Sequence, residues 1–338
     1  WWLWPEMAEV DATPRHEPTP EPTLRAAEPP PTALVEFDPN PLPTDSPAAT
    51  PEPVAAVPPA MPEVAVVEVE PIVSPSVEPS LPAPTGVLDE AASLIRSGDV
   101  VAARATLSKA LRTRTLSATE AADVRGTLTV LNNGMIFGAE VTPGDPFTRL
   151  YEIKSGDALS RIANRESLKT NWRFLQRING IADPSRIRVG QRIKVVQGPF
   201  HAEVDKRAHR IDLWLGEGDE AVFIRSLPVG LGEFGSTPEG AFRVRRGGKM
   251  VNPPWTNPRT GERFAAADPN NPIGEYWIGL DGIDPHNLQE QGFGVHGTID
   301  PESIGEDRSM GCVRLADDDI ALVYEMLTEG NSVVLIRE

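Results

Sequence analysis

His296-Gly297-Thr298, followed ten residues later by Ser309-Met310-Gly311-Cys312-Val313-Arg314, is the most informative stretch of this chain. Cys312 is the only cysteine among 338 residues, so it has no partner for an internal disulfide. A glycine precedes it, and His296 stands sixteen positions upstream. A single cysteine in this setting indicates a thiol nucleophile with an imidazole as its base.

The chemistry expected of this pair sets a requirement on its surroundings. A free cysteine has a pKa of about 8.5, so little thiolate is present at pH 7. We expect an ion pair with His296 to lower the thiol pKa by about two units, or about 2.7 kcal/mol. Backbone N–H groups of the turn at residues 309–312 are expected to form an oxyanion hole, and Arg314 to hold a substrate carboxylate or carbonyl. The alternative is a buried cysteine and a core histidine without chemistry, which the joint pattern disfavours.

Residues 200–338 are expected to fold as a mainly-β sandwich or open barrel. Alternation and β-branched runs predict strands within 200–215 and at 221–229, 240–245, 276–280, 293–296 and 332–336. One helix is predicted at 316–327, where three aspartates enrich the first turn. The long segment 247–271 is expected to act as a lid over the thiol. His286 is expected on a surface loop.

Two other site types are excluded by their surroundings. Gly230-Leu231-Gly232-Glu233-Phe234-Gly235 matches the dinucleotide-binding pattern, but the following residues lead into another strand instead of a helix. We therefore predict a simple loop there. No zinc or calcium ligand pattern occurs, so we expect no metal and no cofactor.

The His-Gly-Thr and Ser-x-Gly-Cys-Val-Arg motifs resemble the active-site signature of the L,D-transpeptidase (YkuD-like) catalytic family. Supporting stretches are 236–242, 252–255 and 271–280, so the resemblance spans nearly all of 200–338. Met310 stands where many members carry a second histidine, and no role for a second imidazole is expected. The resemblance implies a β-sandwich-like fold.

The resemblance also implies an activity. Cys312 would attack the carbonyl of the third residue of a peptidoglycan tetrapeptide stem, D-Ala would leave, and a neighbouring stem amine would resolve the thioester into a 3-3 cross-link. His296 would be the base. Gly297, Ser309 and Gly311 would complete the catalytic set, whereas the implied substrate-binding residues are Arg314, Trp277, Tyr276 and Thr298. Carbapenem-type inhibitors are implied as ligands.

Residues 149–197 are expected to form a second, smaller unit of order β-α-α-β. Its motifs Tyr-x-Ile-Lys-Ser-Gly-Asp-x-Leu and Ile-x-Val-Gly-Gln-x-Ile are similar to those of a LysM module, with an arginine-rich second helix as a departure. A LysM-like module implies binding of peptidoglycan glycan strands in a shallow groove. The residues expected to line that groove are Gly156, Asp157, Ala158, Asn179, Gly180 and Ile181. A compact packing unit without a ligand is the alternative.

Residues 85–140 are expected to form a small helical module that resembles a tetratricopeptide-type hairpin. Its first run, residues 88–111, is interrupted at Ser97-Gly98-Asp99. A third helix is predicted from Ser117, with Glu120 completing a capping box, to an end at Asn132-Asn133-Gly134.

Residues 1–84 are expected to be a disordered, proline-rich, acidic spacer. The first 90 residues hold sixteen acidic and two basic residues and 22 of the 35 prolines. No basic cluster suggests nucleic-acid binding. The opening Trp1-Trp2-Leu3-Trp4 favours a membrane–water boundary, so a membrane anchor upstream of residue 1 is a hypothesis, with a bacterial cell envelope location facing the periplasm or the wall.

Three functions are compatible with these motifs. The leading one is an envelope L,D-transpeptidase whose glycan-binding module raises the local substrate concentration. An L,D-carboxypeptidase that uses water as acceptor is the second. A wall-binding adaptor with an inactive catalytic domain is the third, and the intact motif argues against it.

Overall fold

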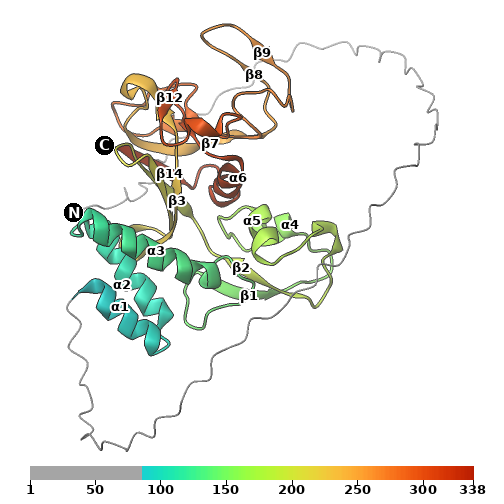
Figure 1. The fold of residues 1–338 in the computed structure, drawn as a ribbon. Coiled ribbons are helices and arrows are strands. Elements are labelled where there is room, and N and C mark those ends of the chain that lie inside the picture. Colours follow the sequence, from blue (N-terminus) through green and yellow to red (C-terminus); the bar gives the residue numbers. More distant parts are fainter. Residues whose placement is uncertain (1–85) are drawn as a thin grey trace, which may run out of the picture. The chain divides into compact units, whose positions relative to one another are not determined.

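The computed structural model describes residues 86–338, which belong to one compact unit (Figure 1). Along the chain they form a group of helices, a small βααβ unit and a larger sheet domain. The spacer expected at residues 1–84 and the tryptophan-rich start lie outside the described residues. No helix among the described residues is both long and apolar enough to cross a bilayer.

Three helices open the described chain: α1 (Val87–Arg96), α2 (Val100–Thr113) and α3 (Ala118–Met135). The predicted break between α1 and α2 is confirmed, since Gly98 has a φ of 84° and the Asp99 side chain caps α2 by accepting from the Ala102 N–H. The capping box of Ser117 and Glu120 is also confirmed. Local sequence signals therefore define the beginnings of these helices.

The predicted end of α3 is wrong. The helix continues through Asn132-Asn133-Gly134 to Met135. Asn132 is fully buried, and its side-chain amide donates to the carbonyls of Phe223 and Ile224 at 2.8 and 3.1 Å. These tertiary hydrogen bonds hold the asparagine in the helix, so packing overrides its weak helix propensity.

The βααβ unit has the element order expected from the sequence. Asn171 caps its second helix, because its side chain accepts from the Arg173 N–H. The two strands pair antiparallel, with Tyr151 opposite Ile193. The elements are β1 (Thr148–Glu152), α4 (Leu159–Arg165), α5 (Trp172–Ile178) and β2 (Arg192–Val196), with a short 3₁₀ turn at Pro184–Arg186 before β2.

The sheet domain is built on eight strands in the order β13-β11-β10-β7-β14-β3-β4-β5, which confirms the mainly-β prediction. The pairs β11–β13 and β14–β3 are parallel, and the other neighbours are antiparallel. The strands are β3 (Phe200–Asp205), β4 (Arg210–Leu215), β5 (Val222–Pro228), β7 (Gly240–Val251), β10 (Tyr276–Gly282), β11 (Gly294–His296), β13 (Val313–Arg314) and β14 (Val333–Arg337).

Smaller elements complete this domain: helix α6 (Asp317–Met326) and the strand pairs β6 (Leu231–Gly232) with β12 (Asp307–Ser309) and β8 (Trp255–Thr256) with β9 (Arg263–Phe264). The glycine-rich stretch at residues 230–235 forms β6 and a 3₁₀ turn before β7. The chain after it enters strand β7 instead of the helix that a dinucleotide-binding motif opens, as the sequence predicts.

The helices cover the edge of the large sheet. Strand β5 lies at one end of the strand order and would otherwise present unpaired backbone groups. The Phe223 N–H donates to the Ser108 hydroxyl on α2, and the Asn132 side-chain amide on α3 donates to the Phe223 carbonyl. Trp214 and Phe223 also share a hydrophobic core with the helices. The helical group is therefore packed into the sheet domain.

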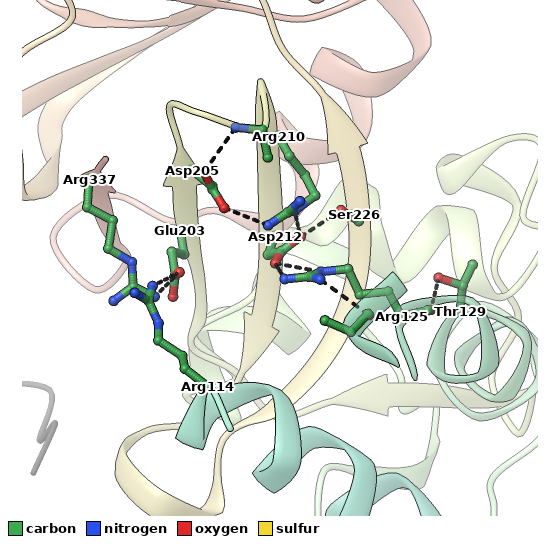
Figure 2. A network of polar contacts seen from close by, with 11 residues as sticks. Arg114, Arg125, Thr129, Glu203, Asp205, Arg210, Asp212, Ser226 and Arg337 are labelled. Carbon is green, nitrogen blue, oxygen red and sulfur yellow. Dashed lines mark hydrogen bonds and ion pairs between the residues drawn. The ribbon is translucent and has the colours of Figure 1, made fainter. Parts of the chain in front are cut away.

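A network of charged groups joins the same surfaces (Figure 2). Glu203 on β3 contacts Arg114, just after α2, and Arg337 on β14. Nearby, Asp212 on β4 accepts from Arg125 on α3 and from Arg210 at 2.9 and 3.1 Å. Each carboxylate thus connects two elements that are distant in sequence.

Candidate active site

His296 and Cys312 are brought together by two neighbouring strands. His296 is the last residue of β11, and Cys312 immediately precedes β13. These strands are parallel, with Val295 opposite Val313 and His296 opposite Arg314. Since alternate residues of a strand share a face, Cys312 lies on the face of Arg314 and His296. The charge of Arg314 acts on both groups.

The imidazole is held in one orientation. His296 is buried, its ring stacks on Trp277 with centroids 5.7 Å apart, and its Nδ1 lies 2.5 Å from the Gly297 carbonyl oxygen. A carbonyl oxygen only accepts, so the neutral ring carries its proton on Nδ1. Nε2 then has the free lone pair of a general base.

The protonation of this pair differs from the sequence expectation. Burial lowers the pKa of His296 to about 4; the hydrogen bond to Gly297 opposes that shift, and the charge of Arg314 adds to it. Burial also raises the pKa of the Cys312 thiol, against the opposing effects of the Gly294 backbone and Arg314. Both shifts run against the expected thiolate–imidazolium pair, because desolvation disfavours both charges. They favour a neutral thiol beside a neutral imidazole.

This result predicts the pH dependence of alkylation. The rate at which iodoacetamide modifies Cys312 should rise about tenfold per pH unit from pH 6 to 8, because the thiolate fraction rises by that factor below the thiol pKa. Mass spectrometry of the intact protein measures the alkylation rate of Cys312 without ambiguity, since no other cysteine is present. A flat rate between pH 5 and 8 would instead reveal an ion pair.

Ser309 and Gly311 shape the turn that carries the thiol. The Ser309 hydroxyl donates to the Cys312 carbonyl at 2.6 Å and accepts from the Gly311 N–H at 3.1 Å. Gly311 has a φ of 127°, which favours glycine. A Cβ on the facing Gly232 would lie 2.7 Å from the Gly311 Cα, so a side chain at position 232 would fit poorly. The Gly311 N–H is thus unavailable to an oxyanion, whereas the Cys312 N–H has no acceptor within residues 86–338.

Arg314 has an available guanidinium. Its backbone pairs with Gly230, and its side chain makes no hydrogen bond or ion pair with another described residue. The Nε is buried without a partner, and Asp300 acts on the group only electrostatically. An arginine in this state is suited to a substrate carboxylate or carbonyl.

The other implied substrate-binding residues do not all lie on one face of the sheet. Trp277 faces His296, but Tyr276 precedes it on β10 and so faces the opposite side, where its ring lies 4.9 Å from that of Tyr324 in α6. The Thr298 hydroxyl accepts from the Asp300 N–H at 3.1 Å, so it stabilises its own loop. Trp277, which stacks on His296, and Arg314, which pairs with it in register, lie on the face of the imidazole.

The polar side chains expected in the glycan groove form hydrogen bonds and ion pairs within the domain. The Asp157 carboxylate accepts from Tyr151 and from the Lys154 N–H and pairs with Arg165 at 2.9 Å. The Asn179 side chain bonds the Leu175 and Lys194 backbone. Backbone groups and small residues remain for a ligand: Gly156 and Ala158, in the loop before α4, and Gly180 and Ile181, which line a groove described below.

The segment expected as a lid, residues 247–271, begins with the end of β7 and continues as the β8–β9 hairpin, with Trp255 stacked on Phe264 at 5.9 Å. Arg259 in its turn contacts Glu233, which follows the Gly232 that packs against Gly311. The hairpin thus reaches the loop beside the thiol turn, and its role as a lid remains a prediction. His286 is exposed, as expected.

Two features of the sheet domain were missed at the sequence level. The first is the charge of Asp300, which acts on Arg314. The second is the charge of Arg173, which acts on Tyr276, and the arginine-rich second helix could have signalled it. Within the described part of the chain, no group of three His, Cys, Asp or Glu side chains is placed to hold a metal ion.

Sequence comparison identifies the two C-terminal parts. Residues 199–336 match the L,D-transpeptidase catalytic domain (YkuD), and residues 151–196 match the LysM domain. YqjB of Bacillus subtilis (strain 168), named as an L,D-transpeptidase, is 30% identical over 138 residues, which cover 41% of this chain and 72% of YqjB. This chain belongs to the L,D-transpeptidase family. The resemblances inferred from the motifs are therefore confirmed.

Further L,D-transpeptidases are similar to this one. YkuD of Bacillus subtilis (strain 168) is 27% identical over 198 residues, covering 55% of this chain and 98% of YkuD. A solved structure, LdtMt1 in complex with imipenem, has 16% identity and a TM-score of 0.30 over 44% of this chain and 63% of that one. The family assignment rests on the sequence matches.

Proposed function

We propose that this L,D-transpeptidase forms 3-3 cross-links between peptidoglycan stem peptides, with Cys312 as nucleophile and His296 as base. The supporting observation is that His296 ends β11 and Cys312 immediately precedes its parallel neighbour β13, with the imidazole proton held on Nδ1. A base whose free nitrogen lies on the face of the single thiol suits acyl transfer through a thioester.

The acylation step follows from the neutral resting pair. As the Cys312 sulfur attacks the carbonyl of the third stem residue, His296 Nε2 takes the thiol proton, so neither group is charged before the substrate arrives. The Cys312 N–H and Arg314 are available to stabilise the oxyanion and the stem. The imidazolium then gives its proton to the departing D-Ala amine, which leaves a thioester.

The second half-reaction reverses these roles. The acceptor amine of a neighbouring stem attacks the thioester carbonyl and loses a proton to Nε2, which restores the thiol as the cross-link forms. Water as the acceptor would give trimmed tripeptides. The proton transfers need only these two residues and the acceptor, so they require no cofactor.

The two domain matches suggest action at the cell wall. We propose that the LysM domain retains glycan strands and that the protein acts while tethered to the membrane. Retention of this kind raises the local concentration of stem peptides without adding a catalytic contact.

Purified disaccharide tetrapeptide dimers test the proposal. The protein should convert them to 3-3 cross-linked products, and Cys312→Ala should leave them unchanged because no other thiol is present. Products are separated by liquid chromatography and identified by mass spectrometry. Tripeptides alone would establish the carboxypeptidase. No turnover, together with no imipenem adduct on Cys312, would establish the adaptor.

A further inference from the structure

A groove of about 380 Å³ lies where the LysM domain meets the catalytic domain. One wall comes from α5 and the loop after it, and the other from the start of β10 and from α6. The residues that matter to the argument are Arg173, Gln176, Gly180, Ile181, Tyr276 and Glu325. Neither domain alone would form this groove.

The two walls are held in a fixed relation. Phe174 of α5 packs edge-on against Phe200 at the start of β3, with ring centroids 5.2 Å apart, and one hydrophobic core runs through both domains. Arg177 of α5 binds Glu325 of α6 in a two-pronged ion pair at 2.5 and 2.9 Å. A ligand in the groove would therefore meet a preformed surface.

The groove offers polar groups that the fold does not use. The Arg173 guanidinium lies 4.7 Å from the Trp172 ring centroid but makes no hydrogen bond or ion pair within residues 86–338. The Tyr276 hydroxyl likewise has no hydrogen-bond partner there, and burial raises its pKa, so it stays a donor. Among the side chains that line the groove, Arg173 and Arg177 are positive and Glu325, paired with Arg177, is negative, so the lining carries one net positive charge. Glu275 and Asp318 act electrostatically on Tyr276 and Arg177 from beside the groove. An available guanidinium beside a phenol suits a carboxylate.

The groove is also connected to the catalytic centre. Tyr276 and Trp277 are successive residues of β10, so one faces the groove while the other stacks on His296. In addition, the Gly297 N–H donates to the Tyr276 carbonyl at 3.2 Å. A ligand held against Tyr276 would thus be positioned relative to the imidazole by a single strand.

We propose that this groove binds a carboxylate of an acidic stem peptide carried by a glycan strand on the LysM domain, with Arg173 and Tyr276 as its contacts. This inference rests on the proposed function for the choice of ligand. It makes the LysM domain and the catalytic domain one composite peptidoglycan site, in which the peptide is recognised in addition to the sugar.

Titration calorimetry tests the inference. The full chain, carrying Cys312→Ala so that nothing is consumed, is titrated with a soluble glycan fragment bearing tetrapeptide stems and with a peptide-free fragment of the same length. Arg173→Gln should weaken binding of the peptide-bearing fragment about tenfold, the scale of a lost charge-assisted hydrogen bond. It should leave the peptide-free fragment within about twofold. Tyr276→Phe should give a smaller loss in the same direction.

Arg192→Gln is the matched control, because Arg192 is an exposed arginine of the same domain on β2, outside the groove. This substitution should leave the affinity for both glycan fragments unchanged. Three results would each overturn the proposal. Arg173→Gln and Arg192→Gln could weaken binding of the peptide-bearing fragment equally, Arg173→Gln could leave that affinity unchanged, or Arg173→Gln could weaken binding of the peptide-free fragment by the same factor. Since binding is measured without the reactive thiol, failure of the proposed reaction leaves this result interpretable.

Discussion

His296→Asn should slow acylation of Cys312 by imipenem about a thousandfold at pH 7, within the range for loss of a general base. Asparagine can still donate to the Gly297 carbonyl, but it offers no basic nitrogen at the position of Nε2. The thiol must then lose its proton to water, and burial raises its pKa. The time course of the adduct, followed by intact mass, gives the rate.

The pH profile separates loss of the base from loss of structure. In the wild-type protein the rate should fall as the pH drops through about 4, where the free imidazole becomes protonated. In His296→Asn that acid limb should vanish, and the rate should climb steadily into the alkaline range. His286→Asn removes an exposed histidine by the same change and should match the wild type. A rate for His296→Asn within threefold of the wild type would exclude the imidazole as the base.

Asp145→Asn should lower the free energy of unfolding by about 3–5 kcal/mol. Asp145 and Arg104 form an ion pair at 2.6 Å with side-chain exposures of 0% and 1%. The asparagine keeps the shape and leaves the Arg104 charge buried without a counterion. Urea unfolding followed by tryptophan fluorescence measures the change.

Asp281→Asn is the control for this ion pair. Arg245 and Asp281 are also 2.6 Å apart, but their side chains are 37% and 53% exposed. Water solvates the charge left behind, so the loss should stay below about 1 kcal/mol. Replacing both Arg104 and Asp145 by Met and Leu should recover most of the stability, because no buried charge remains. Similar losses for Asp145→Asn and Asp281→Asn would show that burial does not set the strength of these pairs.

Much of the fold was predictable because its signals are local. The capping box at Ser117, the turn at Gly98 and the asparagine cap before α5 act through neighbours three residues away or fewer. The end of α3 was not predictable, since the partners of Asn132 lie some ninety residues further along the chain. The separation of Tyr276 from Trp277 was available in principle, because successive residues of any strand face opposite ways.

The sequence by itself determined the family and the order of the elements, because each is encoded in residue types at fixed spacing, and it points to the nucleophile and base that we propose. Only the tertiary structure decided how deeply that pair is buried and formed the groove between the domains. Desolvation depends on which atoms surround His296 and Cys312 in space, and here it is the largest cause of both pKa shifts. The groove likewise exists only because a shared core places α5 beside β10.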